Sequence, residues 1–231
     1  MSRAFCIPGV VFLFCAFVLS FLVSISLPFL PALDVVRTHF GDGQQIQQIQ
    51  TNSSGVEEVR FGIWSACYYD LKGDRTCLPT GHAYSFEIQN PAHSVTALVD
   101  SSWTRGLAVH PVATGATLLA LLFSVSTHIT VTLIASLVSF LAALLTLIAF
   151  AIDIALLGLA RHEMDKLQIG AHTIAGPGFW MTFVSLILCL LAGCTVCFGR
   201  RRERLSGATT TSYPMTSKKG GFFSRFRRNK V

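Results

Sequence analysis

The sequence carries little charge for its length. Of its 231 residues, 13% are Asp, Glu, Lys or Arg, whereas 52% are hydrophobic. Soluble domains average about 25% charged residues, because their surfaces face water. The mean hydropathy of +0.56 is correspondingly high. This composition excludes an ordinary soluble domain and predicts an integral membrane protein.

The sequence also lacks the short motifs that mark common active sites. It contains no nucleophile elbow, phosphate-binding glycine loop, HExxH motif or haem-attachment motif. A lone CxxC, formed by Cys194 and Cys197, lies within an apolar run, which is the wrong place for a redox site. We therefore expect a protein that is not an enzyme, with no catalytic residues, no metal and no cofactor.

Four apolar runs are long enough to cross a bilayer as helices, which takes about 20 residues. They cover residues 7–27, 107–125, 129–159 and 179–198. The first run exceeds the apolar length of about 7–15 residues found in signal peptides, so we interpret it as an uncleaved helix. The predicted fold is an all-α membrane protein with a four-helix transmembrane domain over residues 1–199.

Positive charge follows the fourth run. Residues 200–231 contain ten Lys or Arg and one Glu, a net charge of +9. Basic flanks stay in the cytosol, so with four spans both termini are predicted to be cytosolic. The loop of residues 31–104 is then expected to face outside. The segment 200–231 is too polar to fold alone, and we expect it to form a disordered cytosolic tail.

The end of this tail interleaves phenylalanines with basic residues, among them Arg225, Arg227 and Arg228. Beneath a membrane, this pattern favours binding to the anionic inner leaflet, with no nucleic-acid partner. Cys194 and Cys197 lie at the predicted cytosolic edge of the fourth helix. They are candidates for palmitoylation, with a plain packing role as the alternative.

The loop of residues 31–104 contains the most informative stretch. Apolar side chains alternate over residues 59–63, which predicts a half-buried strand. Cys67 and Cys77 have no other cysteine near them, and we expect them to pair if the loop faces an oxidising compartment. A second strand is predicted within residues 82–88. Such a small sheet would need the disulfide, because its few residues cannot bury enough apolar area to make it stable alone.

Asp153 is an acid inside an apolar run. At about 1.5 Å per residue it lies near the height of Arg105 on the neighbouring helix. We interpret the two as a structural ion pair at the outer interface, with an ion or proton pathway as the alternative. Asn52 begins an Asn-Ser-Ser acceptor pattern for N-glycosylation. Several histidines in the outer segments raise the hypothesis of a pH-responsive surface, beside the alternative that they are incidental.

Three blocks of sequence resemble one family. Gly62-Ile63-Trp64, followed by Cys67 and Cys77, is similar to the signature of claudin-like tetraspan proteins. Residues 59–64, together with residues 104–111 and 144–156, resemble the fungal PalI/SUR family, and its PalI branch in particular. The likeness extends over about residues 5–200.

The resemblance implies a plasma-membrane protein that helps a seven-helix receptor for ambient pH to reach or function at the surface. The first alternative is a SUR-like organiser of stable, eisosome-associated membrane domains. The second is a channel or transporter subunit that uses Asp153. Small residues along the helices allow close packing, within one chain or, as an alternative, in a homo-oligomer. The predicted tail is short beside those of long PalI members, so tail-dependent signalling is not implied.

Overall fold

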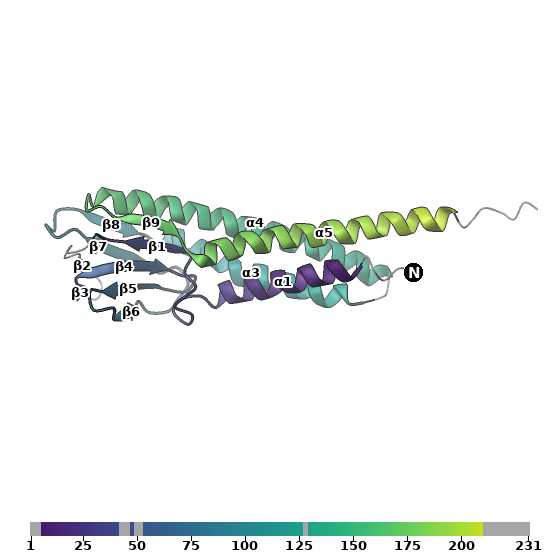
Figure 1. Ribbon diagram of the computed structural model, residues 1–231, viewed down its shortest axis with the longest axis horizontal. Coiled ribbons are helices and arrows are strands. Elements are labelled where there is room, and N and C mark those ends of the chain that lie inside the picture. The colour runs from purple at the N-terminus through teal and green to yellow at the C-terminus, as the bar shows by residue number, and fades with distance from the viewer. Residues whose placement is uncertain (1–5, 42–46, 49–52, 127–128, 210–231) are drawn as a thin grey trace, which may run out of the picture.

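Four long helices form one end of the elongated molecule, and a region of strands forms the other (Figure 1). The computed structural model describes residues 6–41, 47–48, 53–126 and 129–209. The long helices are α1 (Cys6–Ser24), α3 (Val109–Ser124), α4 (Ile129–Lys166) and α5 (Pro177–Thr209). Two short elements lead into α3, namely α2 (Ser101–Thr104) and the 3-10 helix η2 (Arg105–Ala108).

Each predicted membrane span falls on one of these helices. Within the described residues, three helical segments are long and apolar enough to cross a membrane: residues 101–124, 133–166 and 177–195. The apolar part of α1, Pro8–Ser24, is shorter. The full 19 residues of α1 extend about 28 Å, close to the hydrocarbon thickness of about 30 Å.

Small and polar side chains form the inside of the helical bundle. Ala16, Ala120 and Ala192 are fully buried, and the Ser20 hydroxyl on α1 lies 2.6 Å from that of Ser185 on α5. The outward faces instead carry large apolar residues, such as Phe140 with 71% of its surface exposed. This arrangement suits helices in lipid, where small residues allow close approach and large apolar residues face the acyl chains.

Strands make a larger part of the molecule than the sequence predicted. The described residues within 34–100 and 167–176, here named the β head, contain two antiparallel sheets. The five-stranded sheet has the order β6-β5-β4-β1-β9, with strands β1 (Val36–His39), β4 (Val56–Phe61), β5 (Ala66–Asp70), β6 (Arg75–Cys77) and β9 (His172–Ala175). The four-stranded sheet has the order β3-β2-β7-β8, with β2 (Gln47–Gln48), β3 (Ser53–Ser54), β7 (Phe86–Gln89) and β8 (Thr96–Val99). The prediction of an all-α class is therefore wrong.

Both predicted strands exist, with shifted bounds. The strand expected over residues 59–63 is β4, which ends at Phe61 because the chain then turns. The strand expected within residues 82–88 is β7, which begins only at Phe86. Ala83 has a φ of 66°, a left-handed conformation that a strand cannot accommodate.

The core of the β head is continuous with α4. Phe61 from the five-stranded sheet meets Phe86 from the four-stranded sheet edge to face, with ring centroids 5.5 Å apart. Leu156, Met164 and Leu167 belong to the same buried cluster. The last turns of α4 therefore cover the sheets, as Figure 1 shows, and α4 extends to Lys166, beyond the predicted end of its span at residue 159.

Helix α5 continues well past the predicted end of the fourth span. It runs to Thr209, so residues 200–209 are helical where the sequence predicted a disordered tail. An existing helix can add residues without a new nucleation step, which explains the extension. Residues 210–231, including Arg225, Arg227 and Arg228, lie outside the described residues. Helix α1 begins and α5 ends at the same end of the molecule, opposite the β head (Figure 1).

Candidate functional site

The Gly62-Ile63-Trp64 signature forms the turn between β4 and β5. The Gly62 amide donates to the Ser65 carbonyl oxygen over 3.0 Å and closes this turn. A Cβ atom at position 62 would collide with the Cβ of Leu27, which follows α1. Glycine is therefore required here, because the turn lies directly against the segment that leaves the first helix.

The next two signature residues bind the end of α1. The Trp64 indole Nε1 donates to the Ser24 carbonyl oxygen over 2.6 Å, and the Ile63 amide donates to the Ser26 hydroxyl over 3.0 Å. The last carbonyls of a helix have no partner within the helix. Trp64 thus supplies a donor to the final residue of α1 and fastens the β head to the bundle.

A second set of bonds holds the signature turn from the side of the β head. The Tyr84 hydroxyl donates to the Gly62 carbonyl oxygen over 2.7 Å, and the Gly81 amide donates to the Trp64 carbonyl oxygen over 2.9 Å. Burial raises the pKa of the Tyr84 phenol, so its hydroxyl remains a donor at physiological pH. The turn is therefore fixed between α1 and the loop before β7.

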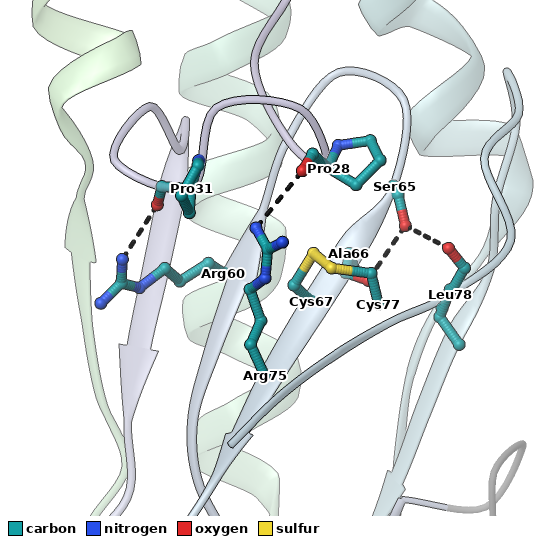
Figure 2. Close-up of a disulfide and its surroundings, with 9 residues drawn as sticks. All are labelled: Pro28, Pro31, Arg60, Ser65, Ala66, Cys67, Arg75, Cys77 and Leu78. Carbon is teal, nitrogen blue, oxygen red and sulfur yellow. Dashed lines mark hydrogen bonds between the residues drawn. A yellow bond between two sulfur atoms is a disulfide. The ribbon is translucent and has the colours of Figure 1, made fainter. Parts of the chain in front are cut away.

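The predicted disulfide between Cys67 and Cys77 is confirmed. The two residues lie opposite each other on β5 and β6. Figure 2 shows Arg75 beside the disulfide, with its Nη1 atom donating to the Pro28 carbonyl oxygen over 3.3 Å. Arg60 donates in the same way to the Pro31 carbonyl oxygen over 3.0 Å (Figure 2). The sheet thus also contacts the chain beyond α1, through two arginines.

Asp34, a buried acid just before β1, connects the five-stranded sheet to the start of α5. The Asp34 side chain is fully buried and accepts two hydrogen bonds from Arg37, at 2.7 and 3.1 Å. The hydrogen bond to Asp34 raises the pKa of the Arg37 guanidinium. The Asp34 carbonyl oxygen accepts from the Gly178 amide over 2.8 Å. Sequence reasoning missed this acid, although its spacing of three from an arginine was a usable signal.

The β head is thus joined to the ends of both α1 and α5, which are far apart in sequence. A family model described as the SUR7/PalI family matches residues 5–193, most of the chain and all of this joint. The chain belongs to the SUR7/PalI family. A comparison with curated proteins gave no match. The family membership confirms the resemblance seen in the sequence, while the PalI branch stays a prediction.

The ion pair predicted between Arg105 and Asp153 does not form in this SUR7/PalI protein. Arg105 is exposed, and the Asp153 Oδ2 atom lies 3.2 Å from His110 Nε2 instead. Arg105 begins the 3-10 helix η2, whose turns of about three residues change which side chains face a neighbouring helix. Gly106 takes the contact with α4, against Ile152.

The other predicted site residues are not gathered into one site. Cys194 is an exposed free cysteine, whereas Asn52 and the side chain of Cys197 lie outside the described part of the structure. His39 Nδ1 is 3.6 Å from Glu58 Oε2 on the neighbouring strand, far in the fold from buried His110. Within the described residues, no three His, Cys, Asp or Glu side chains are placed to hold a metal ion.

Proposed function

We propose that this SUR7/PalI membrane protein is a non-enzymatic component of the plasma membrane that helps an ambient-pH receptor complex to assemble or to reach the cell surface. The observation that carries this proposal is the set of contacts made by the claudin-like signature residues. Gly62, Ile63 and Trp64 all contact the end of α1 or the segment after it. The signature therefore serves to hold the β head on the bundle rather than to bind a small ligand.

A rigid joint of this kind suits a protein that presents two surfaces at once. The β head would face outside the cell, and the helix faces would remain in the membrane. Those faces carry large, exposed apolar residues on several helices, for example Phe14, Leu122, Leu137 and Phe140. Such faces can pack against lipid or against another helical membrane protein, and a seven-helix receptor is a partner of that class.

The resemblance to the PalI branch gives the proposal its specific partner. The blocks that carry this resemblance include the signature turn and the start of the second span, residues 104–111. In the structure these blocks are neighbours, because the Thr104 hydroxyl donates to the Tyr84 carbonyl oxygen and Tyr84 in turn donates to Gly62. Two of the three blocks that resemble the PalI branch are thus neighbours at the joint between the β head and the bundle.

The test measures the surface abundance of a tagged seven-helix pH receptor in cells with and without this gene, at acidic and at alkaline external pH. We expect less receptor at the surface when the gene is deleted. An unrelated membrane protein serves as the control and should be unchanged. Equal receptor abundance in both strains would contradict the proposal.

A second candidate function is the organisation of stable membrane domains. The helical extension of α5 supports it, since Arg200, Arg201, Arg202 and Arg204 follow the apolar part of the helix directly. Basic residues at this position favour anionic lipid headgroups. Static, patchy localisation of the tagged protein, together with unchanged receptor abundance, would favour this second function.

A channel or transporter role has only Asp153 in its favour, and ion flux abolished in Asp153→Asn would be needed to support it.

A further inference from the structure

The bundle contains one buried pair of ionisable side chains among the described residues. His110, in the first turn of α3, has 4% of its side-chain surface exposed, and Asp153 on α4 has none. His110 Nε2 and Asp153 Oδ2 are 3.2 Å apart. An ionisable pair inside an apolar bundle is costly to bury, so its protonation decides whether the site is stable.

The contacts of His110 fix how many protons the pair holds. Its Nδ1 atom lies 3.1 Å from the Leu107 carbonyl oxygen. A carbonyl oxygen can only accept, so Nδ1 must carry a hydrogen. The contact between Nε2 and Asp153 Oδ2 then needs a second proton, on the ring nitrogen or on the carboxyl group. Without that proton, a lone pair would face a buried carboxylate, and the two would repel each other.

We propose that His110 and Asp153 form an intramembrane proton-binding site that holds one proton between Nε2 and Oδ2. The bound ligand is the proton itself, and the site keeps η2 and α3 docked on α4 while it is occupied. The proposal is independent of the partner suggested above. Its failure would leave the receptor proposal intact, and the failure of that proposal would leave the site unchanged.

Among the described residues, the cavity beside the pair is lined by hydroxyl-bearing and apolar side chains, and His110 is its one ionisable lining residue. This small cavity of about 10 Å³, the space of about one water molecule, lies beside His110. Its lining comes from α1, α3, α4 and α5, with residues Ser20, Val23, His110, Ala113, Thr146, Ala149 and Thr182. The nearest charged side chain along η2, Arg105, is exposed. Asp153 Oδ1 has no hydrogen-bond partner among the described groups, and His110 is the described side chain that contacts Asp153 Oδ2.

The proton site connects to the joint that holds the β head. His110 contacts the Leu107 carbonyl of η2, and Gly106 in the same turn packs against Ile152, the residue before Asp153. A Cβ atom on Gly106 would be 3.1 Å from Ile152 Cγ2, so this contact is close. Just before η2, Thr104 bonds to Tyr84. Loss of the proton should therefore weaken the contact between the β head and the bundle, as well as the packing of α3 on α4.

The direct test is solid-state NMR of the full-length protein, labelled with ¹³C and ¹⁵N, in lipid bilayers at neutral pH. The ring signals of His110 are assigned by their loss in His110→Gln. We expect either a doubly protonated His110 ring or a protonated Asp153 carboxyl group. A singly protonated ring beside an ionised Asp153 would overturn the proposal.

Stability in lipid nanodiscs gives the second readout. His110→Ala leaves a buried, unpaired carboxylate and should lower the midpoint of thermal unfolding by about 10 °C. The double variant His110→Ala/Asp153→Asn has no charge left to bury and should recover more than half of that loss. Asp165→Asn, which changes an exposed acid on the same helix, is the matched control and should not rescue His110→Ala. An unaffected His110→Ala, or no recovery in the double variant, would contradict a proton-binding pair.

Discussion

The β head and the helical bundle are each stabilised by a different kind of interaction. In the β head, a few residues make several directed bonds each, and Gly62, Trp64 and Tyr84 all meet at one turn. In the bundle, many alanines and serines share the packing, and large apolar residues face outward. A change at one residue should therefore damage the β head far more than a comparable change on the outer face of the bundle.

The largest effect is expected from Gly62→Val. The new side chain would collide with Leu27, including its backbone, so the signature turn must move away from α1. Overpacking of this kind costs about 3 kcal/mol. Thermal unfolding in nanodiscs would measure the loss. Gly81→Val is the matched control, since a Cβ atom there meets nothing within 4 Å, and equal losses in the two variants would contradict the close contact at Gly62.

Removal of the disulfide should lower the free energy of unfolding nearly as much as Gly62→Val. Cys67→Ser and Cys77→Ser each break the bond between β5 and β6, and a loop of this length contributes about 2–3 kcal/mol. Each variant should reduce delivery to the cell surface, and the double variant should be no worse than either single one. Clearly additive defects, or a free thiol pair detected by mass spectrometry, would count against the bond.

A change on the outer face of the bundle gives the contrast. Phe140 is the most exposed large apolar residue among those described, and Phe140→Leu keeps the face apolar. We expect a change in unfolding free energy below about 0.5 kcal/mol. Unfolding in nanodiscs checks this value. A loss as large as that of Gly62→Val would remove the distinction between the two regions.

The smallest effect concerns the start of α2. The Asp100 carboxylate accepts from the Ser102 amide and hydroxyl, and these hydrogen bonds lower its pKa. A lowered pKa in the folded state stabilises the folded state above the usual pKa of Asp, and this contribution is lost as the pH falls through the lowered value. The protection factors of the amides of residues 101–104, which compare each exchange rate with the intrinsic rate at the same pH, should therefore fall at acidic pH in the wild type. In Asp100→Ala this pH dependence should be absent, and an unchanged profile would contradict the cap.

The sequence predicted the parts of the fold that depend on local pattern. Long apolar runs predicted the helices, and the alternation over residues 59–63 predicted β4. The isolated pair Cys67 and Cys77 predicted the disulfide. What it could not predict depends on distant contacts. Strand β9 pairs with β1 across more than 130 residues, so no local pattern reveals the five-stranded sheet.

The candidate site shows the same limit. The Gly62-Ile63-Trp64 motif was recognisable, but its partner Ser24 lies 40 residues away, and only the fold shows that the motif holds α1. Asp153 was recognised as unusual, yet its partner depended on the winding of η2. A helix rotates by about 100° per residue, so a small change in winding changes which side chain faces the neighbouring helix. An estimate of height alone therefore could not identify the partner of Asp153.

The central claim is that the Gly62-Ile63-Trp64 turn joins the β head to α1, and hydrogen–deuterium exchange tests it most directly. The measurement compares the wild type with Trp64→Phe, which keeps a ring and removes the donor to Ser24. Trp103→Phe, at a residue with 48% of its surface exposed, is the control. The account predicts faster exchange in residues 61–67 and in the last turn of α1 for Trp64→Phe alone. Unchanged protection of both segments in Trp64→Phe would contradict it.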